Sequence, residues 1–432
     1  MKRISIVVST GLVLSLMTNT ASIAAVKAGG GCTKLGSTTT SGGYQYSCIK
    51  SGKKLIWKKG AKDSAAKNDT KSIKNSIPIS LPVKQDGVIT FENAADKYAD
   101  IPKVAWQNVQ EVIAKNPDVS IQTIINIGPN TNADRAAITT GLNRLYKLFS
   151  GFDRFTSYLG IVYNAKDLAW AQTDAVNLFT AQGVKGYITK TESIKRQSEA
   201  GCEMNGSKAV QCSGGMALTF KDGGSNVGGA FYGVENTYTA NGQNKDFWSA
   251  SEKFSGAMTQ VTHEGMHNYQ FAQFFNTPLA SGQNTAADQS HDFTPWWFSE
   301  GQANGIGIPV FIDNLQSYLN ARDQNTNRKP DSRAKIPAPT ADAMKSFLMT
   351  YQSTGPSNGN WSLAYSIGYS AVEALVAIGG PQSTLALYAL GASGENWETA
   401  FKHVYGITWE QGATALGKVL AAEYSAKPLS SN

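Results

Sequence analysis

The segment His263-Glu264-Gly265-Met266-His267 carries two of the four histidines in this 432-residue chain. Their i, i+4 spacing places both imidazoles on one face of a helical turn. Apolar residues recur at helical spacing around them, at Ala257, Val261 and Phe271, and Ser249-Ala250-Ser251-Glu252 has the pattern of a capping box upstream. We therefore expect both histidines to lie on a long buried helix, in the geometry of paired metal ligands.

A second segment, Trp296-Trp297-Phe298-Ser299-Glu300-Gly301, follows in a context that also predicts a helix. Thr294-Pro295 is typical of an N-cap and first helical residue, which would place Glu300 one to two turns into that helix. A catalytic zinc site has three protein ligands and one position open to water. A third ligand is still required, and a carboxylate near the start of a second helix, such as Glu300, could supply it, while Glu264 is placed beside the ligand face to take a proton from the water. The alternative is a buried helix with two hydrogen-bonded core histidines, which leaves the second segment unexplained.

The two segments, His-Glu-x-x-His and Trp-Phe-Ser-Glu-Gly, together resemble the gluzincin division of zinc metallopeptidases in the peptidase MA superfamily. The resemblance covers residues 220–425. It implies one zinc ion per chain, held by His263, His267 and Glu300, with Glu264 as general base. It also implies a two-lobed, zincin-like fold.

Two further candidates come from helices in the same region. Asn304 lies four residues after Glu300, on the same helix face, where it can hydrogen-bond a ligand imidazole. The segment 365–375 resembles the family's helix that offers a tyrosine hydroxyl to the developing oxyanion. That resemblance implies Tyr365 as the donor, with Tyr369 as the second choice. Packing of these aromatic rings in the core is the alternative.

In the same family, extended substrate pairs with an edge strand that precedes the first zinc helix. Residues 230–238 are the candidate strand, within a β-rich region spanning residues 199–240. The segment Gly233-Val234-Glu235-Asn236 partly resembles the Gly-x-Met-Glu-Asn motif of zinc aminopeptidases, which would make Glu235 a ligand for a substrate amine. A strand-end acid is the alternative role. His291 is expected on a surface loop or at the site, and His403 in a structural role.

The N-terminus has the pattern of a secretory signal peptide, residues 1–25. A short basic region precedes an apolar run from Ile4 to Met17, and small residues allow cleavage after Ala24 or Ala25. No second apolar stretch of spanning length is found, so we expect a secreted or cell-surface protein with no transmembrane span after cleavage. Glycines before Cys32 do not match a lipoprotein signal.

The four cysteines form two close pairs, Cys32 with Cys48 and Cys202 with Cys212, and are expected to form disulfides in an exported chain. Residues 28–60 predict a small module of two or three short strands, stapled by the first disulfide. By cysteine spacing it resembles a module found near the termini of actinobacterial cell-surface proteins. That resemblance implies adhesion to the wall, and an inert spacer is the alternative.

Charge separates the N-terminal region from the rest. Residues 1–85 contain 14 Lys or Arg and 2 acidic residues, a net charge of +12, which leaves −5 for residues 86–432 because the whole chain carries +7. Residues 61–85 are expected to form a flexible basic linker. Anionic cell-wall polymers or lipids would attract this region. We do not expect nucleic-acid binding, because no basic surface is interleaved with stacking aromatic residues.

From residue 86 the composition is that of a globular α+β domain. We expect a mixed α/β N-terminal lobe at 86–245, a mainly helical zinc-binding lobe at 246–425, and a tail at 426–432. The leading functional hypothesis is a secreted zinc metallopeptidase acting on peptides or proteins. The other is a non-catalytic envelope-binding protein with the same fold. A serine hydrolase is not supported, because the chain has no Gly-x-Ser-x-Gly elbow.

Overall fold

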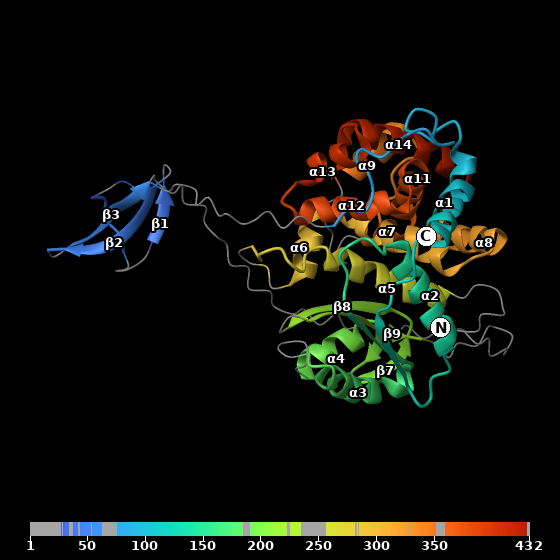
Figure 1. The fold of residues 1–432 in the computed structure, drawn as a ribbon, viewed down its shortest axis with the longest axis horizontal. Helices are drawn as coiled ribbons and strands as arrows, with labels where there is room; N and C mark the ends of the chain where they lie inside the picture. Colours follow the sequence, from blue (N-terminus) through green and yellow to red (C-terminus); the bar gives the residue numbers. More distant parts are fainter. Residues whose placement is uncertain are drawn as a thin grey trace, which may run out of the picture. The chain divides into compact units, whose positions relative to one another are not determined.

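The computed structural model describes residues 27–429 apart from 28, 34–37, 42–43, 53, 63–75, 185–190, 223–224, 235–255, 281–282, 284, 328 and 351–358. The chain divides into two compact units, Met1–Ser72 (the N-terminal unit) and Ile73–Asn432 (the large unit). The protein is mixed α+β, as expected, with helix predominating (Figure 1). The predicted signal peptide, the capping box at Ser249–Glu252 and Glu235 lie outside the described residues.

The N-terminal unit is a three-stranded antiparallel sheet. Its strands, in the order β1-β2-β3, are Thr38–Ser41, Tyr44–Ser51 and Lys54–Lys62. The segment before β1 pairs with the other side of β3, where Trp57 N donates to Gly30 O over 2.8 Å. The predicted disulfide Cys32–Cys48 is confirmed and ties this segment to β2. A unit of this size buries little apolar surface, so the covalent link stabilises it.

The large unit contains a four-stranded sheet in the order β4-β5-β9-β8. Strands β4, β5 and β9 run parallel, and β8 pairs antiparallel with β9. A separate hairpin, β6-β7, is closed by the predicted disulfide Cys202–Cys212, whose cysteines are cross-strand partners. The strands are β4 Gln122–Ile127, β5 Ser157–Tyr163, β6 Cys202–Asn205, β7 Lys208–Cys212, β8 Gly215–Asp222 and β9 Ser225–Gly233.

Several of the described helices begin where a side chain caps the first turn. Asp134 Oδ1 accepts from Ala137 N at the start of α2, and Thr408 with Gln411 forms a capping box at the start of α14. The α-helices are α1 Ile101–Lys115, α2 Arg135–Leu148, α3 Leu168–Ala181, α4 Thr191–Glu199, α5 Gly256–Ala272, α6 Ala286–Phe293, α7 Trp296–Phe311, α8 Leu315–Thr326, α9 Ala341–Thr350, α10 Trp361–Leu363, α11 Tyr369–Gly379, α12 Pro381–Ala392, α13 Trp397–Tyr405 and α14 Trp409–Ala426. A π-helical segment, Ala364–Gly368, joins α10 to α11.

Side chains alternate across the sheet and bury both of its faces. Tyr158 and Tyr232 face the larger core, which also contains α1, α2, α5, α7 and α11–α14. Leu159 and Phe231, one residue away along each strand, face the smaller core beneath α3 and α4. Figure 1 shows the resulting layers: α3 and α4, the sheet, α5 with α7, and the C-terminal helices. The larger core runs from Ile89 to Leu429, so the predicted lobes 86–245 and 246–425 share one apolar core.

The predicted linker is shorter than expected, because its end packs on the large unit. Ile77, Ile79, Leu81 and Val83 contact the larger core, while the residues between them are exposed. The backbone of Val83 donates to Val404 O over 2.8 Å. Residues 76–85, which we name the strap, therefore form an extended segment with one apolar edge. This segment falls within the predicted linker. Its apolar residues alternate with proline and polar residues, a pattern that fits an extended segment with one buried edge.

Two local predictions before α7 are wrong. The segment around His291, for which a surface loop was one expectation, forms helix α6, which begins with a capping box between Thr285 and Asp288. Thr294 ends α6 and Pro295 is the N-cap of α7, so the start of α7 is shifted by one residue from the prediction.

One continuous helical stretch, Trp361–Gly379, has the length and composition of a membrane span. In this structure 89% of its apolar window is buried inside the protein. Its apolar residues are accounted for by packing against α7, α1 and α12.

Candidate metal centre

Helices α5 and α7 pack with their backbones in close approach, and this approach creates the site. Gly307 on α7 lies against the backbone of α5, where an added Cβ would come within 2.8 Å of His263 N. Thr262 Oγ1 donates to Gly307 O over 2.7 Å and fixes the register of the two helices. Glycine is needed at this contact because any side chain would separate the helices.

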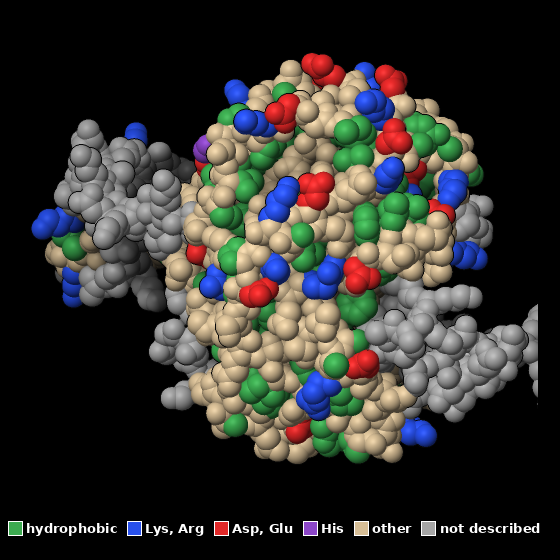
Figure 2. All heavy atoms as spheres, turned by 45° about the vertical axis from the view of Figure 1, so that its right-hand side comes forward, with side chains coloured by type: hydrophobic (Ala, Val, Ile, Leu, Met, Phe, Trp, Pro, Cys, Tyr) green, Lys and Arg blue, Asp and Glu red, His purple; other side chains and the backbone are tan. Residues whose placement is uncertain are grey.

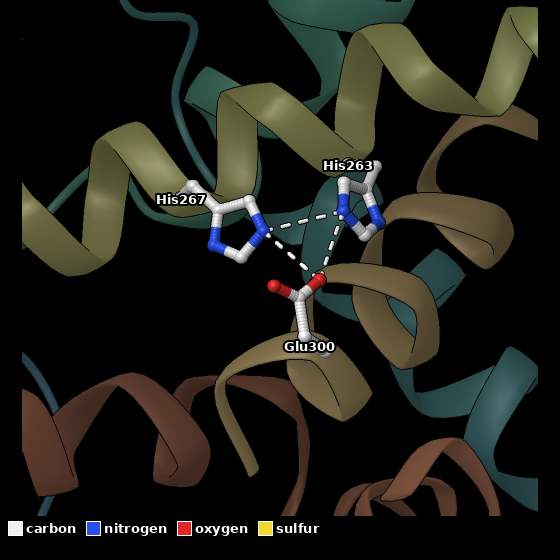
Figure 3. Close-up of side chains that lie close together, drawn as sticks. All are labelled: His263, His267 and Glu300. Carbon is white, nitrogen blue, oxygen red and sulfur yellow. Dashed lines mark hydrogen bonds and ion pairs between the residues drawn. The ribbon is translucent and has the colours of Figure 1, made fainter. Parts of the chain in front are cut away.

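His263 and His267 from α5 and Glu300 from α7 converge on one point (Figure 3). The Nε2 atoms of the two histidines lie 3.2 Å apart. Glu300 Oε2 lies 3.3 Å from His263 Nε2 and 3.4 Å from His267 Nε2. The three side chains are 12%, 9% and 6% exposed. These are the three residues that the sequence predicted as ligands, and the group could hold a metal ion.

Amide oxygens bind the other nitrogen of each imidazole. Asn304 Oδ1 lies 2.9 Å from His263 Nδ1, and Gln270 Oε1 lies 2.8 Å from His267 Nδ1. Carbonyl acceptors fix the orientation of both amides, because Gln270 Nε2 donates to Ser299 O and Asn304 Nδ2 to Tyr365 O. Each Nδ1 must therefore donate its proton to an amide oxygen, which leaves the Nε2 lone pairs directed at Glu300.

With both imidazoles neutral, the lone pairs of the two Nε2 atoms and of Glu300 Oε2 face one another with no hydrogen atom between them. Glu300 Oε2 is buried and accepts no hydrogen bond from any described residue. Lone pairs at this spacing repel, and a buried carboxylate without a partner is unfavourable. A cation at the centre removes both penalties, so the donor set fits a bound metal ion.

The carboxylate and the imidazoles also shift one another's pKa values. Burial lowers the pKa of His267, but the Glu300 carboxylate and its contact with the imidazole have the larger combined effect and raise it to about 9. Burial raises the pKa of Glu300, yet the charge of His267 and the contacts with both imidazoles hold it well below its usual range. Both shifts favour the charged form of each residue, as expected for a carboxylate and an imidazole buried side by side.

Glu264 lies beside this group and points at strand β8. Its carboxylate accepts a hydrogen bond from the backbone of Ala217, and burial is the main cause of its raised pKa. An added Cβ on Gly215 would come within 2.2 Å of Glu264 Oε1. The carboxylate is therefore held between α5 and the first residues of β8.

A cleft of about 1260 Å³ opens over the three residues. Gly215 to Phe220 of β8 form one wall, and the ends of α5, α6 and α7 form the other, with Phe271, His291 and Trp296. Among the described strands, β8 lies along the cleft and is the edge of the sheet, whereas β9 pairs on both sides. The predicted edge strand began at residue 230, but residues 230–233 belong to β9, so that part of the prediction is wrong; residues 235–238 lie outside the described part of the chain.

The π-helical segment separates the two tyrosine candidates. Tyr365 lines the cleft, and its ring stacks on His263 with the centroids 6.0 Å apart. Tyr369 is fully buried beside Tyr318 and Ile308 in a cluster that does not line the cleft. In a regular α-helix residues four apart share a face, and the wider π turn moves them out of line. Of the two, only Tyr365 is placed to meet a molecule in the cleft.

His291 is on helix α6 and lines the cleft, which differs from the expected surface loop. Its ring contacts Phe271 and Trp296 edge-on, with centroids 5.5 and 5.7 Å away. Burial by the cleft walls and the nearby charge of His267 lower its pKa. His403 is exposed on α13, 3.1 Å from Glu395 Oε1, and lies outside the cleft lining.

Sequence reasoning missed Gln270 and Gln302. Gln270 Nε2 also donates to Gln302 Oε1 over 2.8 Å, and Gln302 Nε2 donates to Thr384 Oγ1 over 2.8 Å. This chain of amides connects the imidazole of His267 to helix α12. The spacing offers one signal in retrospect, because Gln270 follows His267 by three residues and so lies near it on the helix surface.

Comparison with protein-family models, with curated proteins and with solved structures finds no match. Function must therefore be argued from the site itself, whose described content is a buried His263-His267-Glu300 group suited to a metal ion.

Proposed function

We propose that this chain is a zinc-dependent peptidase, with zinc held by His263, His267 and Glu300. The observation that carries the proposal is the convergence of three oriented lone pairs next to a buried carboxylate, at the floor of a cleft. The resemblance of the two sequence segments to gluzincin peptidases supports the same reading.

The spacing of the three donor atoms favours zinc. Their separations of 3.2, 3.3 and 3.4 Å describe an almost equilateral triangle. The centre of a regular tetrahedron with such edges is about 2.0 Å from each corner, the ligand distance of zinc to histidine nitrogen and carboxylate oxygen. Two imidazoles and one carboxylate are also a frequent protein donor set of catalytic zinc, with the fourth corner left for water.

The residues around the metal supply the proton transfer and the stabilisation of the oxyanion. When bound, zinc lowers the pKa of a coordinated water and polarises the carbonyl of a peptide bond. Glu264 takes the water proton on its carboxylate and passes it to the leaving amine, a role that its raised pKa favours. Tyr365 donates its hydroxyl to the developing oxyanion.

Strand β8 is the proposed binding edge for the substrate backbone. Among the described strands it pairs with β9 alone, and its residues 215–220 line the cleft. An extended peptide can add to such an edge through backbone hydrogen bonds, which would place one of its carbonyls over Glu264. This mode of binding suits peptides and unfolded protein segments better than compact folded substrates.

The decisive variant is Glu264→Gln in the full-length chain, tested beside the wild type. We expect both proteins to bind about one zinc ion per chain. We expect peptide cleavage by the variant to fall by about 100- to 10,000-fold, because the amide cannot take the proton. Elemental analysis measures the zinc, and mass spectrometry of a mixed peptide library measures cleavage. Glu410→Gln, which changes an exposed carboxylate on α14, is the matched control.

The two hypotheses predict different results. Wild-type cleavage by the Glu264→Gln protein, at full zinc occupancy, would contradict the proposed base. A wild-type protein that binds zinc but cleaves no peptide in the library favours the non-catalytic binding protein.

The two disulfides indicate an oxidising environment, and we propose that the protein acts outside the cell.

A further inference from the structure

The N-terminal unit is rich in lysine, and this excess of positive charge does not stabilise its sheet. Residues 26–62 contain eight lysines and no acidic residue. Like charges on a small sheet repel one another and destabilise it. The acidic residues of this unit, Asp63 and Asp69, follow the sheet and lie outside the described residues, and the eight lysines outnumber them. This cationic excess suits interaction with an external anion.

The lysines of the sheet project from both of its faces. On β3, Lys54 and Lys58 share one face with Ile56, because side chains alternate along a strand. Lys59 lies on the opposite face, and Lys50 of β2 joins it there because it is the cross-strand partner of Leu55. All four lysines are exposed. Of the strand lysines whose side chains are described, each face therefore presents two.

The large unit presents a different surface. Figure 2 shows Lys and Arg interspersed with Asp and Glu on the visible face of the large unit. Residues 86–432 together carry a net charge of −5, against +12 for residues 1–85. A molecule with many negative charges is consequently attracted more strongly to the N-terminal region than to the large unit.

We propose that the N-terminal unit binds a linear polyanion, an extracellular polymer with repeating phosphate or carboxylate groups. A flat membrane can contact only one face of the sheet, whereas a flexible polymer can contact lysines on both faces. The disulfides place the chain in an oxidising environment, where polymers other than nucleic acid are the expected polyanions. Binding of this kind would tether the large unit to a surface. It is independent of the proposed peptidase activity.

The test measures binding of the full-length chain to long-chain polyphosphate and to polyglutamate over a range of salt concentrations. Two pair variants separate the faces: Lys54→Gln with Lys58→Gln, and Lys50→Gln with Lys59→Gln. For polyphosphate we expect each pair to lower the slope of log K against log salt by about 1.4 to 1.8, because each lysine releases counterions on binding. The matching Lys→Arg pairs should bind like the wild type.

A control variant replaces four exposed lysines of the large unit by glutamine, at Lys103, Lys166, Lys402 and Lys418. We expect it to retain polymer binding. Equal weakening by this control overturns the proposal, as does unchanged binding after all four lysines of the sheet are replaced. Binding to vesicles containing phosphatidylglycerol that depends on only one pair would show a membrane-binding face instead. Tighter binding to duplex DNA than to polyphosphate would also contradict the proposal.

Discussion

At the scale of single residues, the geometry of the candidate metal centre depends on groups outside the three candidate ligands. The amide oxygens of Asn304 and Gln270 determine which nitrogen of each imidazole faces Glu300. Such partners typically contribute strongly to metal affinity because they hold the ring and its tautomer. Asn304 was predicted from its position on the face of Glu300, whereas Gln270 was not.

Replacing Gln270 by Met tests this arrangement. The side chain keeps its size but loses the acceptor of His267 Nδ1, so we expect zinc affinity to fall about 10- to 100-fold. Competition with a chromogenic chelator measures the affinity. Gln289→Met is the matched control, since Gln289 is buried at the same cleft and its Nε2 donates only to Pro278 O. Equal affinities in wild type and Gln270→Met would show that Gln270 does not orient the ligand.

Replacing Gly215 by Ala tests the position of Glu264. The new methyl group would lie within 2.2 Å of Glu264 Oε1 and force the carboxylate away from its place. We expect zinc content to stay unchanged and peptide cleavage to fall at least about 10-fold, because small displacements of a catalytic group are costly. Gly87→Ala, where the added Cβ meets nothing closer than 3.9 Å, is the control. Unaltered cleavage by Gly215→Ala would contradict the proposed role of Glu264.

At the scale of elements, a buried cluster of charges joins three helices on the far side of α7 from the sheet. Arg322 on α8 contacts Glu373 on α11 through Nε, 2.7 Å from Oε2, and Glu423 on α14 through Nη2. Tyr318 donates to Glu373 as well. Each carboxylate is buried or nearly so, which makes the guanidinium the necessary partner of both.

Arg322→Met should therefore destabilise the large unit by about 3 to 5 kcal/mol, because it removes the shared countercharge of Glu373, which is fully buried, and of Glu423, which is 15% exposed. Urea unfolding followed by tryptophan fluorescence gives the free energy. Lys427→Met removes the cation of an exposed pair with Asp323, where the two side chains are 57% and 49% exposed. The Lys427→Met control should lower the free energy of unfolding by less than about 1 kcal/mol. Similar losses for both variants would mean that the buried cluster is not required for stability.

At the scale of the whole molecule, the strap determines where the large unit begins. Its four inward side chains, Ile77, Ile79, Leu81 and Val83, cover part of the larger core. Gln85 Nε2 also donates to Tyr405 O over 2.6 Å, which ties the strap to the end of α13. A boundary at residue 86, as composition suggests, would remove all of these contacts.

A fragment beginning at Ile73 should consequently be more stable than one beginning at Asp86. Partial burial of four apolar side chains contributes several kcal/mol, at about 1 kcal/mol for each. Urea unfolding of the two fragments measures the difference. A third fragment, beginning at Ile73 with Ile79→Ser and Leu81→Ser, should fall between them if apolar contact is the cause. Equal stability of all three would show that the strap does not contribute.

The sequence by itself determined what depends on short separations along the chain. The i, i+4 spacing of His263 and His267 follows from helix geometry alone, and the two disulfides join cysteines 16 and 10 residues apart. Helices α2 and α13 follow from apolar periodicity and from their capping residues Asp134 and Asn396. The identity of Glu300 as a partner was available only because the second segment resembles a known pattern.

Only the tertiary structure decided which distant parts meet. The approach of α5 and α7 at Gly307, the edge position of β8 and the packing of the strap arise from contacts between segments far apart in sequence, which no local pattern encodes. The choice of Tyr365 over Tyr369 rests on one π turn held by packing against α7. The orientation of the metal centre likewise depends on amides whose own partners come from other helices. The residue types of the candidate site can therefore be read from short segments of sequence. The meeting of their side chains depends on how the helices pack in the core.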